Sequence, residues 1–260
     1  MALHWPSHRA VVGGMRPEDL ECIRRLGDGA AGSIWLARHR ATGQRHALKL
    51  LSKARMARGR GKAARALNEL NILRASDHPF IVTLAASFQT DEFLCHVLEY
   101  CSGGNLYDLL HGGALREPHA RFFAAQILSA LEYLHFMGYI HRDLKPENIL
   151  ITSVGHIRLA DFDLSQVADG GVLQMAVPFN AEAAAQHGAL PPAGATGDGQ
   201  RQAKNPDDGS SFNSFVGTVE YCAPEVIEGT GHSFGVDHWV LGVLIYVSAA
   251  TGCCDMPPPL

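Results

Sequence analysis

A change of hydrophobic period near residue 105 constrains the fold of this chain most strongly. Residues 20–101 contain short runs of the kind that form strands, broken by glycine-containing turns such as GDGAAG and ATGQ. Such runs predict an antiparallel sheet, here of five strands with one helix over residues 54–75. From Asn105 the apolar spacing becomes helical, and a long helical segment opens at Pro118 and stops at Gly138. The sequence therefore predicts an α+β chain whose sheet precedes a mainly helical part.

Other segments show no sustained period. Residues 1–18 are expected to form a loose leader, before a sheet-based part at 19–101 and a helical part at 102–246. Within the helical part, 21 of the 46 residues from 168 to 213 are Ala, Gly or Pro. Because such a segment buries too little apolar surface to offset its ordering entropy, we expect a disordered insertion there. Residues 247–260 are expected to form a separate tail.

Charge and cysteine usage exclude several classes of protein. The 22 basic and 26 acidic residues give a formal charge of −4, which argues against nucleic-acid binding through bulk charge. The longest apolar stretch, 239–250, is too short to span a bilayer, and the first ten residues lack a signal-peptide pattern. Six cysteines without a CxxC pair predict reduced thiols. We expect a monomer in the cytoplasm, with the nucleus as the alternative location.

A glycine motif and a lysine give the first chemical signals. Gly27, Gly29 and Gly32 fit GxGxxG, and the chain continues as a strand, so the loop lies in a hairpin that could cover phosphates. An ordinary glycine-rich hairpin is an equal alternative at this point. Lys49 lies on the third strand, and Glu69 follows on the expected helix, where it could fix the ammonium. Taken alone, Lys49 would more often be a solvated strand lysine.

Three further motifs decide between these alternatives. YIHRDLKPEN at 139–148 is followed by DFD at 161–163 and by APE at 223–225, in this order and with suitable spacing. With these motifs the chain resembles a eukaryotic protein kinase. SFVGTVEYCAPE and the insertion after DFD are similar to the AGC group of serine/threonine kinases, and DFD itself is similar to the plant-type, phototropin-like branch. The resemblance implies a two-lobed fold, with a small sheet lobe and a larger helical lobe.

The resemblance also implies a function and its residues. It implies ATP and Mg²⁺ as cofactors and transfer of the γ-phosphate to protein Ser/Thr hydroxyls. Asp143 would orient the substrate hydroxyl, Lys145 would steady the γ-phosphate, and Lys49 with Glu69 would hold phosphates. Asn148 and Asp161 would bind magnesium. The nucleotide would contact Leu26, Gly27, Gly29, Gly32, Ile34, Ala47, Lys49, Glu99, Cys101 and Leu150.

Regulation is implied in the same way. Ser214 lies where relatives carry an activation-loop phosphorylation site, and Arg142 and Arg65 would pair with its phosphate. An upstream activating kinase would then be a partner. The basic run at 53–65 could indicate nucleic acid or acidic lipid, although a solvated helix face is favoured. The alternative function is a weak or inactive kinase fragment, or a nucleotide-binding regulator.

The end of the chain departs from the kinase pattern. Residues 237–246 follow the buried helix of the family, and the sequence then abandons it. We therefore expect a C-terminally truncated or intron-read-through product. A helix that lacks part of its usual cover would expose Trp239, Leu244 and Ile245.

Overall fold

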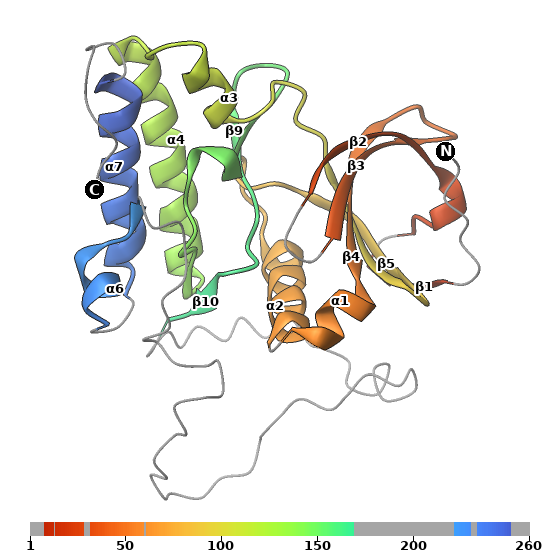
Figure 1. The fold of residues 1–260 in the computed structure, drawn as a ribbon. Coiled ribbons are helices and arrows are strands. Elements are labelled where there is room, and N and C mark those ends of the chain that lie inside the picture. Colours follow the sequence, from red (N-terminus) through yellow and green to blue (C-terminus); the bar gives the residue numbers. More distant parts are fainter. Residues whose placement is uncertain are drawn as a thin grey trace, which may run out of the picture.

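Two lobes of different secondary structure build the molecule (Figure 1). The computed structural model describes residues 8–12, 14–28, 32–59, 61–168, 221–229 and 233–250. The first lobe is an antiparallel sheet with two helices against it, and the second is mainly helical. The α+β, two-lobed fold class predicted from the sequence is confirmed.

The small lobe is one six-stranded sheet in the order β1-β5-β6-β4-β3-β2, with every neighbouring pair antiparallel. Side chains alternate between its faces, as the strand period requires. Leu48 and Leu50 pack with Val97 on one face. The other face of β4 turns Leu51 toward the helices. The strands are β1 (His8–Val12), β2 (Leu20–Asp28), β3 (Gly32–His39), β4 (Arg45–Ser52), β5 (Leu84–Thr90) and β6 (Phe93–Glu99).

Strand β1 corrects the expectation of a loose leader over residues 1–18. It pairs with β5, with a register shift between Ala10 and Val12, so the small lobe has six strands instead of five. The outer edge of β5 offers unpaired backbone groups, and a short run with Val11 and Val12 suits a strand. A 3₁₀ turn at Pro17–Asp19 then leads into β2.

Two helices replace the single helix expected over residues 54–75. Helix α1 (Lys53–Arg58) is capped by Ser52, whose side chain accepts a hydrogen bond from the Arg55 amide. Helix α2 (Lys62–Ala75) begins after Gly61, which has a φ of 75°. Because a left-handed residue cannot lie inside an α-helix and glycine adopts it at no steric cost, the chain breaks there.

The large lobe packs around two long helices, α4 (Glu117–Phe136) and α7 (Gly235–Ala250), which lie side by side (Figure 1). Leu131 and Leu134 of α4 share a buried cluster with Leu241 and Leu244 of α7. Helices α3 (Leu106–His111) and α6 (Pro224–Glu228) lie at its margins. Short strands β7 (Tyr139–Ile140), β8 (Ile149–Ile151), β9 (Ile157–Leu159) and β10 (Gln166–Val167) carry the loops between the lobes.

Helix α7 differs from the expectation at its end. It runs to Ala250, so residues 247–250 of the expected tail continue the helix, and residues 251–260 lie outside the described residues. Trp239 and Ile245 are exposed, as expected. Leu244 is buried, because the contact with α4 covers that side of the helix.

Some sequence expectations fall partly outside the described residues. Ala168, the first residue of the expected insertion, is buried beside Ile140, whereas residues 169–213 are not described. Of the cysteines within the described ranges, Cys22, Cys95 and Cys101 are free thiols. Within the same ranges no helix is both long and apolar enough to cross a membrane.

Candidate active site

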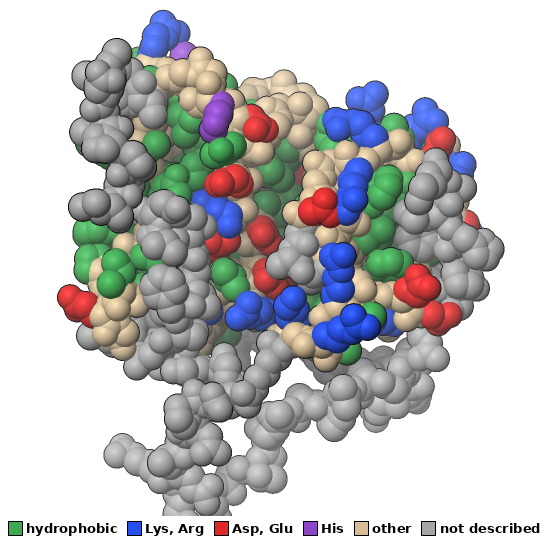
Figure 2. Space-filling view, in the orientation of Figure 1, with side chains coloured by type: hydrophobic (Ala, Val, Ile, Leu, Met, Phe, Trp, Pro, Cys, Tyr) green, Lys and Arg blue, Asp and Glu red, His purple; other side chains and the backbone are tan. Residues whose placement is uncertain are grey.

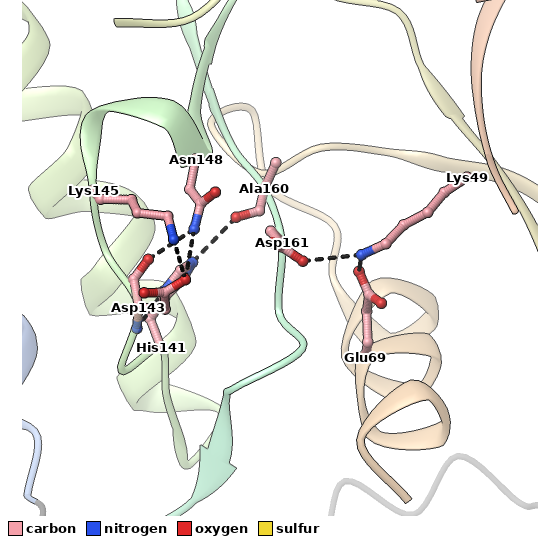
Figure 3. Close-up of polar contacts among 8 residues, drawn as sticks. All are labelled: Lys49, Glu69, His141, Asp143, Lys145, Asn148, Ala160 and Asp161. Atoms are coloured by element: carbon pink, nitrogen blue, oxygen red, sulfur yellow. Dashed lines mark hydrogen bonds and ion pairs between the residues drawn. The ribbon is translucent and has the colours of Figure 1, made fainter. Parts of the chain in front are cut away.

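Strand register and helix packing bring Lys49 and Glu69 together. Lys49 shares its face of β4 with Leu51, which packs against α1 and α2, so its side chain points toward α2. Its Nζ donates to Glu69 Oε1 at 2.6 Å and to Asp161 Oδ1 at 2.9 Å (Figure 3). Since β4 and α2 belong to the small lobe and Asp161 follows β9 of the large lobe, this ammonium joins the lobes.

Lys49 is therefore held as a cation. Burial alone would lower the pKa of its ammonium, but the carboxylates of Glu69 and Asp161 outweigh burial and raise that pKa above its ordinary value. In the opposite direction, the Lys49 charge holds the pKa of Asp161 below its usual range, against the effect of burial. At neutral pH the site thus presents a positive charge beside an ionised carboxylate.

Asp161 and Asn148 are positioned by the backbone of the large lobe. Asp161 has a φ of 64°, in the left-handed region that aspartate tolerates better than most residues. The preceding amide, Ala160 N, donates to Asn148 O at 2.9 Å, so the segments carrying the two residues lie side by side. The Nδ2 of Asn148 donates to Asp143 O at 2.8 Å and to Asp143 Oδ2 at 3.3 Å.

These oxygens suit a magnesium ion. With Nδ2 of Asn148 committed to Asp143, its Oδ1 is left to act as a ligand. Lys49 binds one oxygen of Asp161, which leaves the second. Magnesium prefers oxygen ligands and is commonly held by one or two side chains together with substrate phosphates. The donor set therefore fits the predicted Mg²⁺.

Asp143 forms the second polar cluster. Its carboxylate is buried and accepts from Lys145 Nζ at 2.8 Å. Its amide donates to Nδ1 of His141 at 3.3 Å, and Nε2 of that ring donates to Ala160 O at 3.3 Å (Figure 3). Lys145 and Asn148 thus bond to the Asp143 carboxylate, while His141 links the backbone of Asp143 to the loop of Asp161.

A buried residue that the sequence reasoning did not assign to the site, Asp237 on α7, fixes this loop. Its Oδ2 accepts from His141 N at 2.8 Å and from His135 Nε2 at 2.8 Å, and its Oδ1 accepts from Arg142 N at 2.9 Å. Arg142 has a φ of 65°, which is strained for a non-glycine residue. The sequence carries only a weak signal for this role, an aspartate near the start of a mostly apolar helix.

The predicted nucleotide contacts lie on both lobes. The small lobe provides Leu26 and Gly27 on β2, Gly32 and Ile34 on β3, and Ala47 on β4, while Leu150 lies on β8 of the large lobe. Cross-strand pairing brings Gly27 opposite Ile34 and Ala47 opposite Leu98. Gly29 lies outside the described residues. The predicted nucleotide contacts within the described residues thus come from both lobes.

The packing of the strands explains why residue 32 must be glycine, which the motif alone did not indicate. A Cβ at this position would lie 1.6 Å from Leu50 O, on the neighbouring strand β4, where Gly32 pairs with Leu51. A Cβ on Gly27 would meet nothing within 4 Å. The third glycine of the motif is therefore required by hairpin packing, and the first is free for a ligand to approach.

The connection between the lobes is held by an ion pair. Glu99, at the end of β6, accepts from Arg158 Nε at 2.7 Å, and Arg158 also donates to Pro79 O. The Glu99 amide donates to Thr83 O at 2.9 Å. Cys101 follows in a buried position, where burial raises the pKa of its thiol to about 12. Glu99 and Cys101, two of the predicted nucleotide contacts, thus lie in a segment that these bonds hold in place.

The predicted regulatory arginines lie near each other. Burial and the neighbouring charge of Arg65 lower the pKa of Arg142 to about 10. Its guanidinium donates to Leu164 O at 2.8 Å and to the Gln166 side chain. Arg65 is exposed on α2, on the helix face that also carries Glu69. Ser214 lies outside the described residues.

A two-lobed fold with these two polar clusters between the lobes is typical of phosphotransferases that act on nucleotides. A family model described as the protein kinase domain matches residues 20–179 and 201–253. The chain belongs to the protein kinase family. The match reaches seven residues beyond 246, where the sequence reasoning ended the resemblance.

Curated relatives agree with the predicted group. The chain is 46% identical over 234 residues to serine/threonine-protein kinase nrc-2 of Neurospora crassa, with 88% of the chain and 36% of the relative aligned. It is 40% identical to serine/threonine-protein kinase AGC1-5 of Arabidopsis thaliana, with 88% and 45% aligned. Phototropin-1A of Oryza sativa is 43% identical, with 86% and 24% aligned. The predicted resemblance to AGC kinases is confirmed. The chain spans less than half the length of these relatives.

Proposed function

We propose that the protein is an ATP- and Mg²⁺-dependent serine/threonine kinase. The observation that carries the proposal is the Lys49 ammonium, bound at once to Glu69 of the small lobe and Asp161 of the large lobe. Such an ammonium, fixed between carboxylates of two lobes, is suited to hold nucleotide phosphates. The names of the relatives support the choice of Ser/Thr hydroxyls as acceptors.

Each residue has a role in moving a phosphoryl group between two oxygens, which requires in-line placement and neutralised charge. Magnesium, when bound through Asn148 and Asp161, would neutralise charge on the phosphates. Asp143 accepts or orients the proton of the substrate hydroxyl. Lys145 would steady the γ-phosphate, and its bond to Asp143 supports this role because it keeps the ammonium beside the residue that handles the hydroxyl. Asp237 keeps the loop that carries Asp143 in its strained form.

A transfer assay tests the proposal. The full 260-residue chain is incubated with γ-labelled ATP, Mg²⁺ and a mixed protein substrate, and the labelled amino acids are identified after hydrolysis. We expect phosphoserine and phosphothreonine, with no transfer when Mg²⁺ is chelated. Nucleotide binding without any transfer would contradict the proposal and favour a nucleotide-binding regulator. Label on tyrosine alone would contradict the assigned acceptor.

Phosphorylation of Ser214 is proposed as the activating step, with an upstream kinase as partner. A phosphate there would pair with Arg142 and Arg65, whose mutual repulsion it would relieve. We expect Ser214→Ala to lower the activity of a phosphorylated preparation by about 5–150-fold, the usual range for coupling between sites. Ser211→Ala is the matched control. Unchanged activity in Ser214→Ala, measured by the same transfer assay, would refute the regulatory role.

A further inference from the structure

The small lobe carries a run of positive charge without acidic residues. Between Asp28 and Glu69 the sequence has ten Lys and Arg residues and no Asp or Glu, although acidic residues outnumber basic ones in the whole chain. Six of the ten lie between residues 53 and 65. Such a separation of charge is expected to create a local positive potential that the net charge of the chain conceals.

The structure places this charge on one edge of the small lobe. Met56 is buried against Leu51 and Ala66, and it anchors α1 to the lobe. Arg55 and Arg58 lie three residues apart on α1 and are both exposed. Figure 2 shows Lys and Arg side chains gathered along this edge, over α1 and the start of α2. We call Arg55, Arg58, Lys62 and Arg65 the basic edge.

The carboxylates of the small lobe do not neutralise α1. Within the small lobe, the ion pairs among the described residues join Arg38 to Glu21, Arg25 to Asp28, Lys49 to Glu69, and Arg16 to both Glu18 and Asp19. None of the ion pairs found in the described ranges includes Arg55 or Arg58. The basic edge therefore has charge available for a partner outside the described part of the chain.

The residues between the cations indicate the shape of that partner. Ala54, Ala57, Ala63 and Ala64 are exposed and short, so these four residues do not protrude between the cationic side chains of the basic edge. Residues 36–79 include no Phe, Tyr or Trp, which removes the usual platforms for stacking on single-stranded nucleic acid. A smooth surface of long cationic side chains suits a plane of negative charge.

The number of cations also favours a membrane surface. Clusters of about 4–8 Lys and Arg residues on a helix are typical of binding to anionic lipid headgroups. We propose that the basic edge docks the small lobe on a membrane leaflet rich in anionic phospholipid. Neither Arg55 nor Arg58 belongs to the candidate active site, so this docking requires no nucleotide.

Vesicle binding tests the proposal. The full chain is sedimented without ATP with vesicles of phosphatidylcholine containing about 30 mol % phosphatidylserine, and with vesicles of phosphatidylcholine alone. We expect binding only to the anionic vesicles, and we expect it to be lost in about 1 M salt, where screening is strong. Equal binding to both kinds of vesicle, or to neither, would overturn the proposal.

A matched pair of variants locates the surface. Each cation near the membrane is expected to change the affinity about fivefold, so Arg55→Gln with Arg58→Gln should weaken binding about 25-fold. Arg116→Gln with Arg121→Gln removes the same charge from exposed residues of the large lobe and should change the affinity less than about twofold. Equal weakening of both variants would overturn the proposal, as would tighter binding to duplex DNA or polyglutamate than to the anionic vesicles. Melting temperatures of both variants verify that they fold.

Discussion

Replacing Asp143 with asparagine lowers kcat by about 10²–10⁴-fold while ATP binding is retained, if the carboxylate handles the proton of the substrate hydroxyl. Asparagine has almost the same shape, and it can accept from Lys145 Nζ as Asp143 does at 2.8 Å. It cannot accept the proton of an attacking hydroxyl. The measurement is steady-state transfer with the purified variant, together with the dissociation constant for Mg-ATP.

Asp77→Asn is the matched control for this variant. Asp77 is an exposed aspartate that follows α2, outside the site. We expect its kcat to equal that of the wild type. If Asp143→Asn kept full kcat, the assigned proton role would be wrong. If it lost ATP binding together with kcat, Asp143 would be needed to build the site, and its chemical role would be refuted as well.

The largest expected loss of stability follows Asp237→Ala. This change removes the acceptor of two backbone amides, His141 N and Arg142 N, and of the His135 ring. Removing one partner of a buried, hydrogen-bonded charge typically costs about 3–5 kcal/mol, so the free energy of unfolding should fall by roughly that amount. For a chain of this size the melting temperature should fall by about 6–20 °C. Glu132→Ala, at an exposed position of α4, is the control and should melt like the wild type.

The pH dependence gives this prediction a second readout. Burial alone would raise the pKa of Asp237, but the hydrogen bonds from the His135 ring and from the two backbone amides outweigh burial and lower that pKa below its ordinary value. The stability that the ionised carboxylate contributes is therefore present above the ordinary aspartate pKa and is lost as the pH falls through the lowered one. The difference in stability between wild type and Asp237→Ala should be constant between about pH 5 and 7 and should shrink below about pH 4. A difference that grew on acidification would contradict the assignment.

Much of the fold could be predicted because local patterns determine it. Short runs separated by glycine turns predict β2 to β4. A helical segment that opens at Pro118 and stops at Gly138 predicts α4. Strand β1 was missed because its evidence is the free edge of β5, a tertiary feature. The break at Gly61 was missed because a glycine inside a basic helical run does not reveal its left-handed φ.

The candidate site, like the fold, could be predicted only in part from the sequence. Lys49, Glu69, Asp143, Asn148 and Asp161 come from motifs, and the structure brings them into two clusters that meet through the Ala160 segment. Asp237 could not be assigned from the sequence, because its contacts join residues about 95 positions apart. The chemical residues were thus visible in local strings, and the residue that positions them was visible only in three dimensions.

Thermal melting of the 260-residue chain with and without Mg-ATP tests most directly the central claim, that the two lobes form a nucleotide site. At about 100 times its dissociation constant, a ligand that binds only the folded state adds roughly 2.7 kcal/mol. For a chain of this size we expect a cooperative transition that moves upward by about 5–10 °C, with no shift for ATP when magnesium is chelated. A cooperative transition that Mg-ATP leaves unmoved at every concentration would contradict the account.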